Sequence, residues 1–319
     1  GSNIQILNFD SNYSLETVPI SSNQEFIPKI KNLPGIKHVQ VFATKAGIIK
    51  TENAIQGVVL KGVGSDFDWE FFKSNMTEGT VFTVTDTGRT NQVIISKKIS
   101  EMLGLKTGDS FAMYFVQDPP RSRKFTISGI YETSLEEFDK MYVFCDISHI
   151  RRLNGWKDDQ VSGFEIFISD FDRLDDMYQA VRDAVGYRLV ENETQFKVTS
   201  IRMKYPQIFD WLNFQDMNVL IIITLMLLVA GFNMISGLLI LILEKTNMIG
   251  ILKALGTENK TIRKIFLYQA VYLIGKGLLW GNAIGLGLAL LQMKTGIISL
   301  DPTSYYIKTV PVNLNPTHI

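Results

Sequence analysis

Cysteine and histidine are scarce in this chain of 319 residues. The single cysteine, Cys145, lies in the segment Met141–Asp146. With only one cysteine no intrachain disulfide can form, and a buried strand thiol is the expected role. His38, His149 and His318 have no ligand spacing, which argues against a metal site. Lysine plus arginine and aspartate plus glutamate each number 32, so no excess charge points to a nucleic-acid partner.

Catalytic motifs are also missing from the sequence. No phosphate-binding Gly-x-x-x-x-Gly-Lys-Ser/Thr loop occurs, because Gly275-Lys276-Gly277 lacks the first glycine and the hydroxyl. Neither Gly-x-Ser-x-Gly nor His-Glu-x-x-His is present. We therefore expect no enzymatic activity, metal or cofactor on this chain. The acidic pairs are interpreted as solvated surface, and they are Glu136-Glu137, Asp158-Asp159 and Asp175-Asp176.

Two long apolar stretches dominate the second half of the chain. Residues 217–243 contain no charged side chain, and because about 20 apolar residues cross a bilayer they are predicted to form a transmembrane helix. Residues 265–293 are predicted to form a second one, interrupted by Lys276. A charge at that depth either faces protein or water with a function or extends to the interface, and both interpretations stay open.

The segment between the two spans, residues 244–264, is basic. It holds three lysines and an Arg263-Lys264 pair against Glu244 and Glu258. Short basic loops stay in the cytoplasm, so the region before the first span and residues 294–319 are expected on the opposite side. No apolar signal segment precedes that large region. We therefore expect a transmembrane helix before residue 1 and another after residue 319.

The centre of this loop is apolar although its flanks are polar. It is predicted to form a short helix that Gly256 ends, with Thr257 beginning the next helix. So short a loop cannot bury its own apolar side chains, and we expect a partner protein to cover them; a helix lying in the lipid interface is the alternative. The residues assigned to this contact are Met248, Ile249, Gly250, Ile251, Leu252, Lys253, Ala254, Leu255 and Gly256.

The region before the spans is predicted to be α+β, with short strands and short helices in no strict βαβ order. Residues 1–62 and 151–200 are expected to form one discontinuous subdomain around a β-rich insert, 63–150, and residues 201–216 a connecting helix. The expected helices are 24–31, 97–103 and 173–185, capped by Ser22, Ser96 and Asp170. The expected strands are 39–49, 54–63, 91–95, 110–116, 124–131, 141–144 and 161–169.

Gly277, Gly281 and Gly285 recur every fourth residue, which predicts close helix packing in lipid.

The loop sequence resembles the signature of FtsX-like permeases, the MacB-type ABC transporters. The resemblance rests on Met248–Gly256 and Ile262–Phe266, and the lipoprotein-releasing (Lol-type) branch is the most similar. Many members have an acidic residue where this chain has Met248. Further similar segments are Gly57–Val63, Val93–Lys97, Leu103–Asp109, Phe125–Tyr131 and Leu300–Tyr306.

This resemblance implies a four-helix permease of the inner membrane, of which the chain is a fragment. It implies a periplasmic domain with a porter-like part and a β-rich insert. It also implies a separate ATPase dimer that binds ATP and magnesium and grips the coupling helix, together with a second permease, identical or not. In the Lol-type branch the expected activity is extraction of lipoproteins from the membrane toward a periplasmic carrier.

Lipoprotein release requires a lateral opening for acyl chains. Methionine and phenylalanine adapt to irregular chains, so Met217, Leu220, Phe232 and Met234 are candidates for lining it, with ordinary lipid-facing surface as the alternative. Two other functions stay open, namely MacB-type efflux of a periplasmic substrate and non-transporting mechanotransmission that activates a cell-wall hydrolase. An enzyme or adhesive ectodomain on a membrane anchor is the least favoured interpretation.

Overall fold

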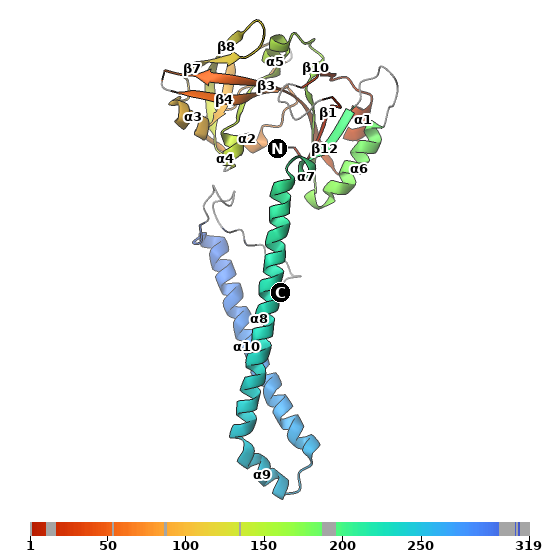
Figure 1. Ribbon diagram of the computed structural model, residues 1–319, viewed down its shortest axis with the longest axis vertical. Helices are drawn as coiled ribbons and strands as arrows, with labels where there is room; N and C mark the ends of the chain where they lie inside the picture. Colours follow the sequence, from red (N-terminus) through yellow and green to blue (C-terminus); the bar gives the residue numbers. More distant parts are fainter. Residues whose placement is uncertain are drawn as a thin grey trace. The chain divides into compact units, whose positions relative to one another are not determined.

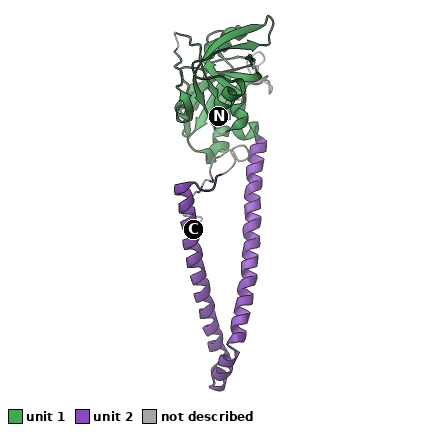
Figure 2. Cartoon of the chain, turned by 90° about the vertical axis from the view of Figure 1, so that its left-hand side faces the viewer, with its two compact units in different colours: residues 1–205, 301–306 green, residues 206–300, 307–319 purple. Residues whose placement is uncertain are grey.

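The computed structural model describes residues 2–10, 17–52, 54–85, 88–133, 135–186, 196–299, 310 and 312. It divides into two compact units, one ending at Tyr205 and one beginning at Pro206 (Figure 2). The first unit is mixed α/β with a large sheet, and the second consists of two long helices joined by a short one. The predicted outer segment 294–319 lies, from residue 300 onward, almost wholly outside the described residues.

The first unit is built around a ten-stranded sheet (Figure 1). Its strand order is β12-β1-β11-β3-β4-β9-β6-β8-β5, and β7 pairs with β3 and β8; β2 and β10 form a separate pair. The strands are β1 Ile4–Asn8, β2 Ile20–Ser21, β3 Ile36–Lys50, β4 Ile55–Val63, β5 Met76–Gly79, β6 Gln92–Ser96, β7 Ser110–Phe115, β8 Arg121–Tyr131, β9 Tyr142–Asp146, β10 Gln160–Val161, β11 Gly163–Ile168 and β12 Phe196–Ser200.

Strand β7 closes part of this sheet into a barrel made of β3, β4, β9, β6, β8 and β7. The closing contact pairs Ile48 of β3 with Tyr114 of β7. β3 is 15 residues long, so its first part pairs with β11 in the open sheet and its second part belongs to the barrel.

The predicted boundary at residues 62 and 63 falls at the end of β4, inside this barrel. The β-rich insert 63–150 does not complete a barrel alone, because β3 and β4, which precede it, supply two of the barrel strands. One backbone ladder runs through both halves, and the region up to Tyr205 forms a single compact unit.

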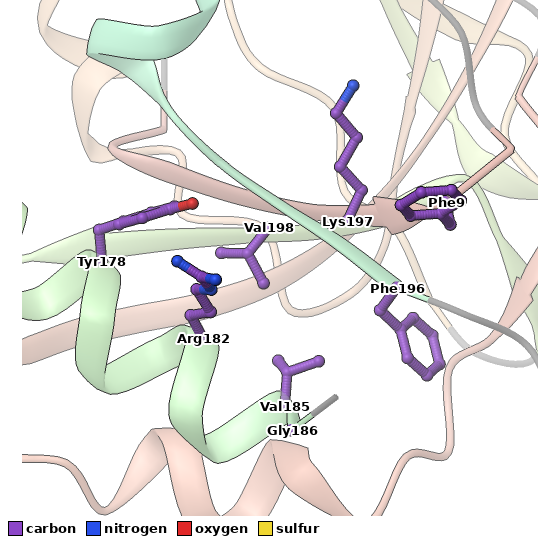
Figure 3. A pocket seen from close by; sticks show the side chains of 8 residues that line it. All are labelled: Phe9, Tyr178, Arg182, Val185, Gly186, Phe196, Lys197 and Val198. Atoms are coloured by element: carbon purple, nitrogen blue, oxygen red, sulfur yellow. The ribbon is translucent and has the colours of Figure 1, made fainter. Parts of the chain in front are cut away.

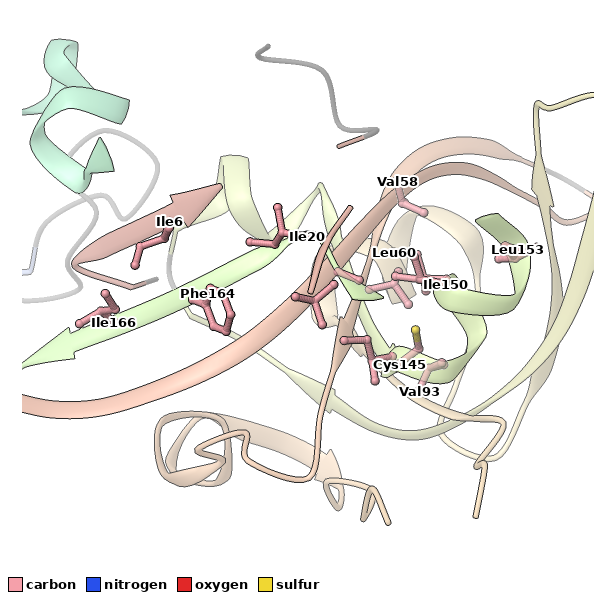
Figure 4. Packing of buried hydrophobic residues seen from close by; sticks show 14 of the residues in the cluster. Ile6, Ile20, Val58, Leu60, Val93, Cys145, Ile150, Leu153, Phe164 and Ile166 are labelled. Carbon is pink, nitrogen blue, oxygen red and sulfur yellow. The ribbon is translucent and has the colours of Figure 1, made fainter. Parts of the chain in front are cut away.

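One hydrophobic core extends through the barrel and the open sheet (Figure 4). In β1 the side chains of Ile4 and Ile6 are fully buried while Gln5 points to the other face, as expected for a strand with one face on the core. Cys145 on β9 is fully buried in this core, which confirms the predicted strand thiol. Burial, with a smaller effect of Asp146, raises the pKa of the Cys145 thiol well above its ordinary value.

The helices of the first unit are short, and the predicted Ser96 cap is confirmed, because its hydroxyl accepts a hydrogen bond from the Ile99 backbone N–H at the start of α3. Asp170 accepts one from the Asp172 N–H at the start of η1 and does not cap the predicted helix, α6, whose N-cap is Arg173. Ser22 does not cap α1, because that helix begins later, with Glu25 as its N-cap. The helices are α1 Phe26–Lys31, α2 Glu70–Ser74, α3 Lys97–Leu103, α4 Glu136–Asp139, α5 Ile147–Asn154, η1 Phe171–Arg173, α6 Leu174–Val185 and α7 Ile201–Lys204.

The second unit contains α8 (Pro206–Glu244), α9 (Thr246–Ala254) and α10 (Asn259–Thr295). α8 has 39 residues and α10 has 37, and both are long and apolar enough to cross a membrane. Of the segment assigned to a connecting helix, 201–216, residues 201–204 form α7, and residues 206–216 continue into the predicted span as one helix. Proline stands only at the first position of α8, where a helix tolerates it, so nothing interrupts the helix before Glu244.

Candidate coupling helix and domain anchor

Helix α9 lies between the two long helices and ends at a defined stop. Gly256 has a φ of +86°, its N–H donates to the Lys253 carbonyl, and the Thr257 N–H donates to the Leu252 carbonyl. This is a Schellman motif, and it confirms the predicted stop at Gly256. The next helix does not begin at Thr257, because Glu258 is the N-cap of α10 and its carbonyl accepts from Thr261 and Ile262.

The side chains of α9 separate into two faces. Ile249 and Leu252 are half-buried within the second unit. Met248, Ile251 and Leu255 are 37%, 63% and 78% exposed, and at about 100° per residue they fall on one side of the helix. We call these three residues the apolar stripe. A short helix thus presents apolar side chains that no described part of this chain covers.

The remaining residues of the predicted contact lie around the helix. Gly250 and Ala254 are exposed beside the apolar stripe, on the side away from Leu252. Lys253 is also exposed, but it lies roughly 160° from Ile251 around the helix axis and so faces away from the stripe. The structure therefore brings together only part of the predicted set.

The residues predicted to line an acyl passage lie on α8 but do not share a face. Phe232 and Met234 are two positions apart, which places them on nearly opposite sides of a helix. A different group forms an apolar cleft of about 410 Å³ on α8. This cleft is lined by Ile222, Leu225, Met226, Val229, Ala230 and Asn233, which recur at helical spacing.

The predicted packing glycines Gly277, Gly281 and Gly285 lie along α10. A side chain at any of them would meet no atom of the described structure within 4 Å, so the chain itself does not fill this strip. Lys276 directly precedes the first of these glycines, and its Nζ lies 5.1 Å from the centre of the Tyr272 ring.

The sequence analysis missed a polar cluster in the first unit. Glu165 on β11 is buried, and its carboxylate accepts from Lys61 Nζ at 2.7 Å, Gln40 Nε2 at 2.9 Å and Gln5 Nε2 at 3.1 Å. Gln5, Glu165 and Gln40 are direct neighbours on β1, β11 and β3. Burial acts to raise the pKa of the Glu165 carboxyl, but the Lys61 charge and the hydrogen bonds outweigh it, so this pKa is lowered.

The same cluster reaches the end of the first unit. Lys204 Nζ donates to Gln5 Oε1 at 2.8 Å. The next residue, Tyr205, shares a side-chain hydrogen bond with Tyr142 and packs edge-on against Phe138 at 5.3 Å. Since α8 begins at Pro206, these contacts hold the residues directly before the first long helix. We call Lys204, Tyr205 and their partners the domain anchor.

A sequence signal for this cluster does exist. Lys61 and Glu165 are the only charged residues in two largely apolar strands, Ile55–Val63 and Gly163–Ile168. Charges of opposite sign in two such strands indicate a buried pair. Their separation by about a hundred residues hides the partnership until the strand order is known.

The first unit also contains a cavity of about 260 Å³ between α6 and β12 (Figure 3). Arg182 of α6 extends toward Val198, whereas Lys197 extends away from it (Figure 3). The two cations therefore do not converge on one ligand position. Within the described residues no group of three or more metal-ligating side chains occurs.

Comparisons with known proteins find similarity both in the helical unit and over most of the chain. A family model described as FtsX-like permease C-terminal matches residues 220–316. The chain is similar to the lipoprotein-releasing system transmembrane protein LolC of Haemophilus influenzae, with 24% identity over 92% of this chain and 75% of LolC. It is also similar to LolE of the same organism, with 21% identity over 84% of this chain and 64% of LolE.

Among solved structures, the periplasmic region of MacB from Actinobacillus actinomycetemcomitans aligns with 65% of this chain and 92% of its own length. The identity is 12% and the TM-score is 0.40.

Proposed function

The chain carries an FtsX-like permease domain, and from this premise we propose that it is the membrane subunit of an ABC transporter that releases lipoproteins from the inner membrane. In this proposal a separate ATPase dimer binds ATP and magnesium, and a second permease completes the complex. The similarity to LolC and LolE, both described as proteins of a lipoprotein-releasing system, supports this cargo.

The observation that carries the proposal is the apolar stripe on α9. Met248, Ile251 and Leu255 are exposed on a short helix that ends at a defined stop, between two helices long enough to cross a membrane. Exposed apolar side chains on a rigid short helix are typical of a protein contact surface. The ATPase dimer is the partner we propose for this surface.

The proposed orientation follows from charge. The segment around α9 is basic, with Lys260, Arg263 and Lys264 at the start of α10, and such loops stay in the cytoplasm. The mixed α/β unit then lies in the periplasm. Cysteines introduced at Lys260 and at Lys106 test this, because an impermeant thiol reagent applied outside should label only the second.

The proposed transmission route runs along α8. A displacement of α9 by the ATPase would move α8, which is continuous from Glu244 to Pro206. At that end the domain anchor ties Lys204 and Tyr205 to the sheet. Rigid elements joined in this way carry a displacement from one end to the other. The apolar cleft on α8, which includes Met226, is the surface we propose for acyl chains.

Site-directed crosslinking tests the ATPase contact. In the full-length protein in its membrane, cysteine at Ile251 should form an adduct with the ATPase through a short bifunctional reagent. Cysteine at Lys253 is the matched control, since it is exposed on the same helix but faces the other way. Equal adducts at both positions, or none at Ile251, would overturn the proposed contact.

Depletion of the protein in cells tests the cargo. We expect outer-membrane lipoproteins to accumulate in the inner membrane. Normal lipoprotein sorting with changed drug or toxin tolerance would instead indicate efflux, and normal sorting with a co-purified cell-wall hydrolase would indicate mechanotransmission. Either result would contradict lipoprotein release.

A further inference from the structure

The two ends of the large sheet in the first unit differ in how they are protected. Within the described residues the terminal strands, β5 and β12, each pair with a single neighbour. β5 has four residues, and its register with β8 shifts between Met76 and Glu78. β12 has five residues in unbroken register with β1. A bulge is one device by which proteins protect a sheet edge from further pairing, and β12 keeps a regular edge instead.

The hydrogen bonding of β12 to β1 shows which of its backbone groups face outward. The Ile201 N–H donates to the Asn3 carbonyl at 2.8 Å, in line with the register of the two strands. In an antiparallel ladder every second residue bonds to the neighbouring strand. Counted back from Ile201, the odd-numbered residues of β12 bond to β1. The N–H and C=O groups of Phe196 and Val198 therefore point away from β1, toward the open edge.

The side chains of the same two residues line the cavity between β12 and α6 (Figure 3). Phe196 and Val198 are half-buried, and the Phe196 ring packs edge-on against Phe26 with 5.0 Å between ring centres. Tyr178 and Val185 of α6 line the same cavity. The hydrophobic core is thus partly open along the edge that also presents backbone donors and acceptors.

The size of the cavity favours side chains of a peptide over a separate small molecule. Its volume is about 260 Å³, whereas small-molecule sites typically have about 300–1,000 Å³. An open strand edge beside an apolar groove is the arrangement that binds extended peptides by strand addition. In that mode the main-chain hydrogen bonds supply affinity, and the groove holds alternate side chains.

Cations lie on both faces of this edge. Arg182 extends toward Val198 and Lys197 extends away from the cavity, and none of the lining residues is acidic (Figure 3). Arg182 and Lys197 each interact with other groups as well, so neither is a dedicated site for one carboxylate. Their charges nevertheless favour acidic over basic side chains beside the edge.

We propose that β12 is a docking edge for an extended segment of another protein, with apolar residues at alternate positions and acidic residues between them. The segment would add to the sheet as an antiparallel strand. Residues opposite Phe196 and Val198 would exchange backbone hydrogen bonds with them. Directly opposite residues share one face of a sheet, so these same residues would place their apolar side chains in the cavity.

The acidic residues of the segment would then lie on the other face of the sheet, where Lys197 is. A second β12 strand is a poorer occupant, because it would bring another lysine to an edge that is already basic. The docking edge goes beyond the proposed function, since it requires neither the membrane placement nor the lipoprotein cargo.

Peptide binding to the full-length protein in lipid nanodiscs tests the docking edge. The probe is the fluorescent peptide Thr-Val-Glu-Val-Glu-Val-Thr with blocked ends, its affinity is measured by anisotropy, and empty nanodiscs give the background. Methylation of the valine nitrogens removes the N–H groups that face β12 in antiparallel addition, whereas methylation of the glutamate nitrogens removes those on the outer side. We expect the first change to weaken binding about tenfold or more and the second to keep it within about twofold.

The two methylated peptides separate strand addition from other kinds of binding. The opposite asymmetry would indicate parallel addition to the same edge and would also support the proposal. Equal affinities of the two methylated peptides, or no binding of the unmodified peptide, would overturn it. An edge already covered by a second copy or by another segment of this chain would give the second of these results.

Val198→Pro tests the same edge from the protein side. The Val198 N–H points away from β1, so proline removes a bond to the peptide and none to β1, which is where edge strands tolerate proline. Affinity for the unmodified peptide should fall about tenfold with little change in the unfolding temperature. Thr199→Ala, whose side chain lies on the other face, is the matched control and should bind normally.

Normal affinity in folded Val198→Pro would contradict the docking edge. If this variant unfolds, the methylated peptides still decide the matter with the unaltered protein. Neither measurement depends on lipoprotein sorting, so the docking edge and the proposed cargo fail separately.

Discussion

The Nζ of Lys61 on β4 lies 2.7 Å from Oε1 of Glu165 on β11, and the two side chains are only 13% and 2% exposed. β3 lies between these two strands, so the pair bridges across a strand on one face of the sheet. The Lys61 Nζ also lies 5.5 Å from the centre of the Phe42 ring. Every oxygen of the Glu165 carboxylate thus has a partner.

Removing one member of this pair should destabilise the first unit strongly. Lys61→Met leaves the Glu165 carboxylate buried without its cation, and such a loss typically costs about 3–5 kcal/mol of unfolding free energy. Denaturant unfolding of the purified protein measures this change. The double variant Lys61→Met/Glu165→Leu should recover part of it, because no unpaired charge then remains.

An exposed pair provides the control for this prediction. Lys97 and Glu132 lie 3.5 Å apart with side chains 49% and 32% exposed. Lys97→Met should change the unfolding free energy by less than about 1 kcal/mol. Equal changes in unfolding free energy for Lys61→Met and Lys97→Met would show that burial does not determine the contribution of these ion pairs to stability.

His149 on α5 makes the stability of the first unit depend on pH. Its Nε2 donates to the Thr90 carbonyl at 2.8 Å, and within the described residues Nδ1 has no hydrogen-bond partner. Burial, helped by the charges of Arg89 and Arg123, lowers the pKa of His149 below 6.5. The unfolded chain therefore binds a proton at His149 before the folded chain does.

This linkage predicts a loss of stability as the pH falls below about 6.5. Above the pKa of the unfolded imidazole, His149 favours the folded state. As the pH falls below that pKa, this stabilisation decreases, and the decrease stops once the imidazole of the folded state is also protonated. His149→Gln cannot titrate and should lack this component in unfolding experiments between about pH 7 and pH 5. The lowered pKa of Glu165 affects stability only below the ordinary carboxyl pKa of 4.5, so the pH effects of His149 and Glu165 occur in different pH ranges. Identical pH profiles for both proteins would refute the assignment to His149.

Gly163 on β11 is required for close strand packing, whereas Gly57 on β4 is not. A methyl group at Gly163 would overlap the Ile6 carbonyl oxygen of the neighbouring strand β1, but one at Gly57 would meet nothing within 4 Å. We expect Gly163→Ala to destabilise the first unit by about 3 kcal/mol through overpacking. Gly57→Ala should stay within about 0.5 kcal/mol. Thermal unfolding of both variants distinguishes these outcomes.

Features fixed by neighbouring residues could be predicted from the sequence. Ser96 and Gly256 are examples, because a cap or a stop depends on side-chain chemistry and backbone freedom within a few positions. The two long helices were predictable for a similar reason, since a run of apolar residues identifies them without knowledge of the fold.

Features that depend on the order of strands could not be predicted. Closure of the barrel requires β7 to meet β3, whose paired residues Ile48 and Tyr114 lie far apart in sequence. The domain anchor likewise joins Gln5 to Lys204. In the candidate site, the sequence identified the apolar residues of α9, but only the structure separates exposed Ile251 from half-buried Leu252. Side-chain exposure depends on which helices pack together, and no local pattern specifies that.

A charge in the apolar stripe should separate the ATPase from the permease. Ile251→Asp places a carboxylate on a surface that we propose to be buried in the complex, and an unpaired buried charge is strongly unfavourable. We expect at least tenfold less ATPase recovered with the full-length protein. Lys253→Ala, on the opposite side of α9, should recover it normally. Normal recovery with Ile251→Asp would show that the stripe is not the contact.

Loosening the domain anchor should uncouple ATP hydrolysis from transport. Tyr205→Ala removes the contacts with Tyr142 and Phe138 directly before α8. In reconstituted full-length complex we expect near-normal ATP hydrolysis but several-fold less lipoprotein released per ATP. Arg202→Ala is the control, because its ion pair with Asp175 is exposed. A parallel fall in hydrolysis and release would contradict a role in coupling.

The shared strand β3 restricts how proteins with this architecture can exchange parts. A recombination that replaced residues 63–150 with a segment from another protein would leave β3 and β4 in place, and these are two strands of the original barrel. The incoming segment would have to match their register, or leave their backbone groups unpaired at a sheet edge. A junction ahead of Ile36 would move the same mismatch to the pairing of β3 with β11, so viable chimeras should exchange the first unit as a whole.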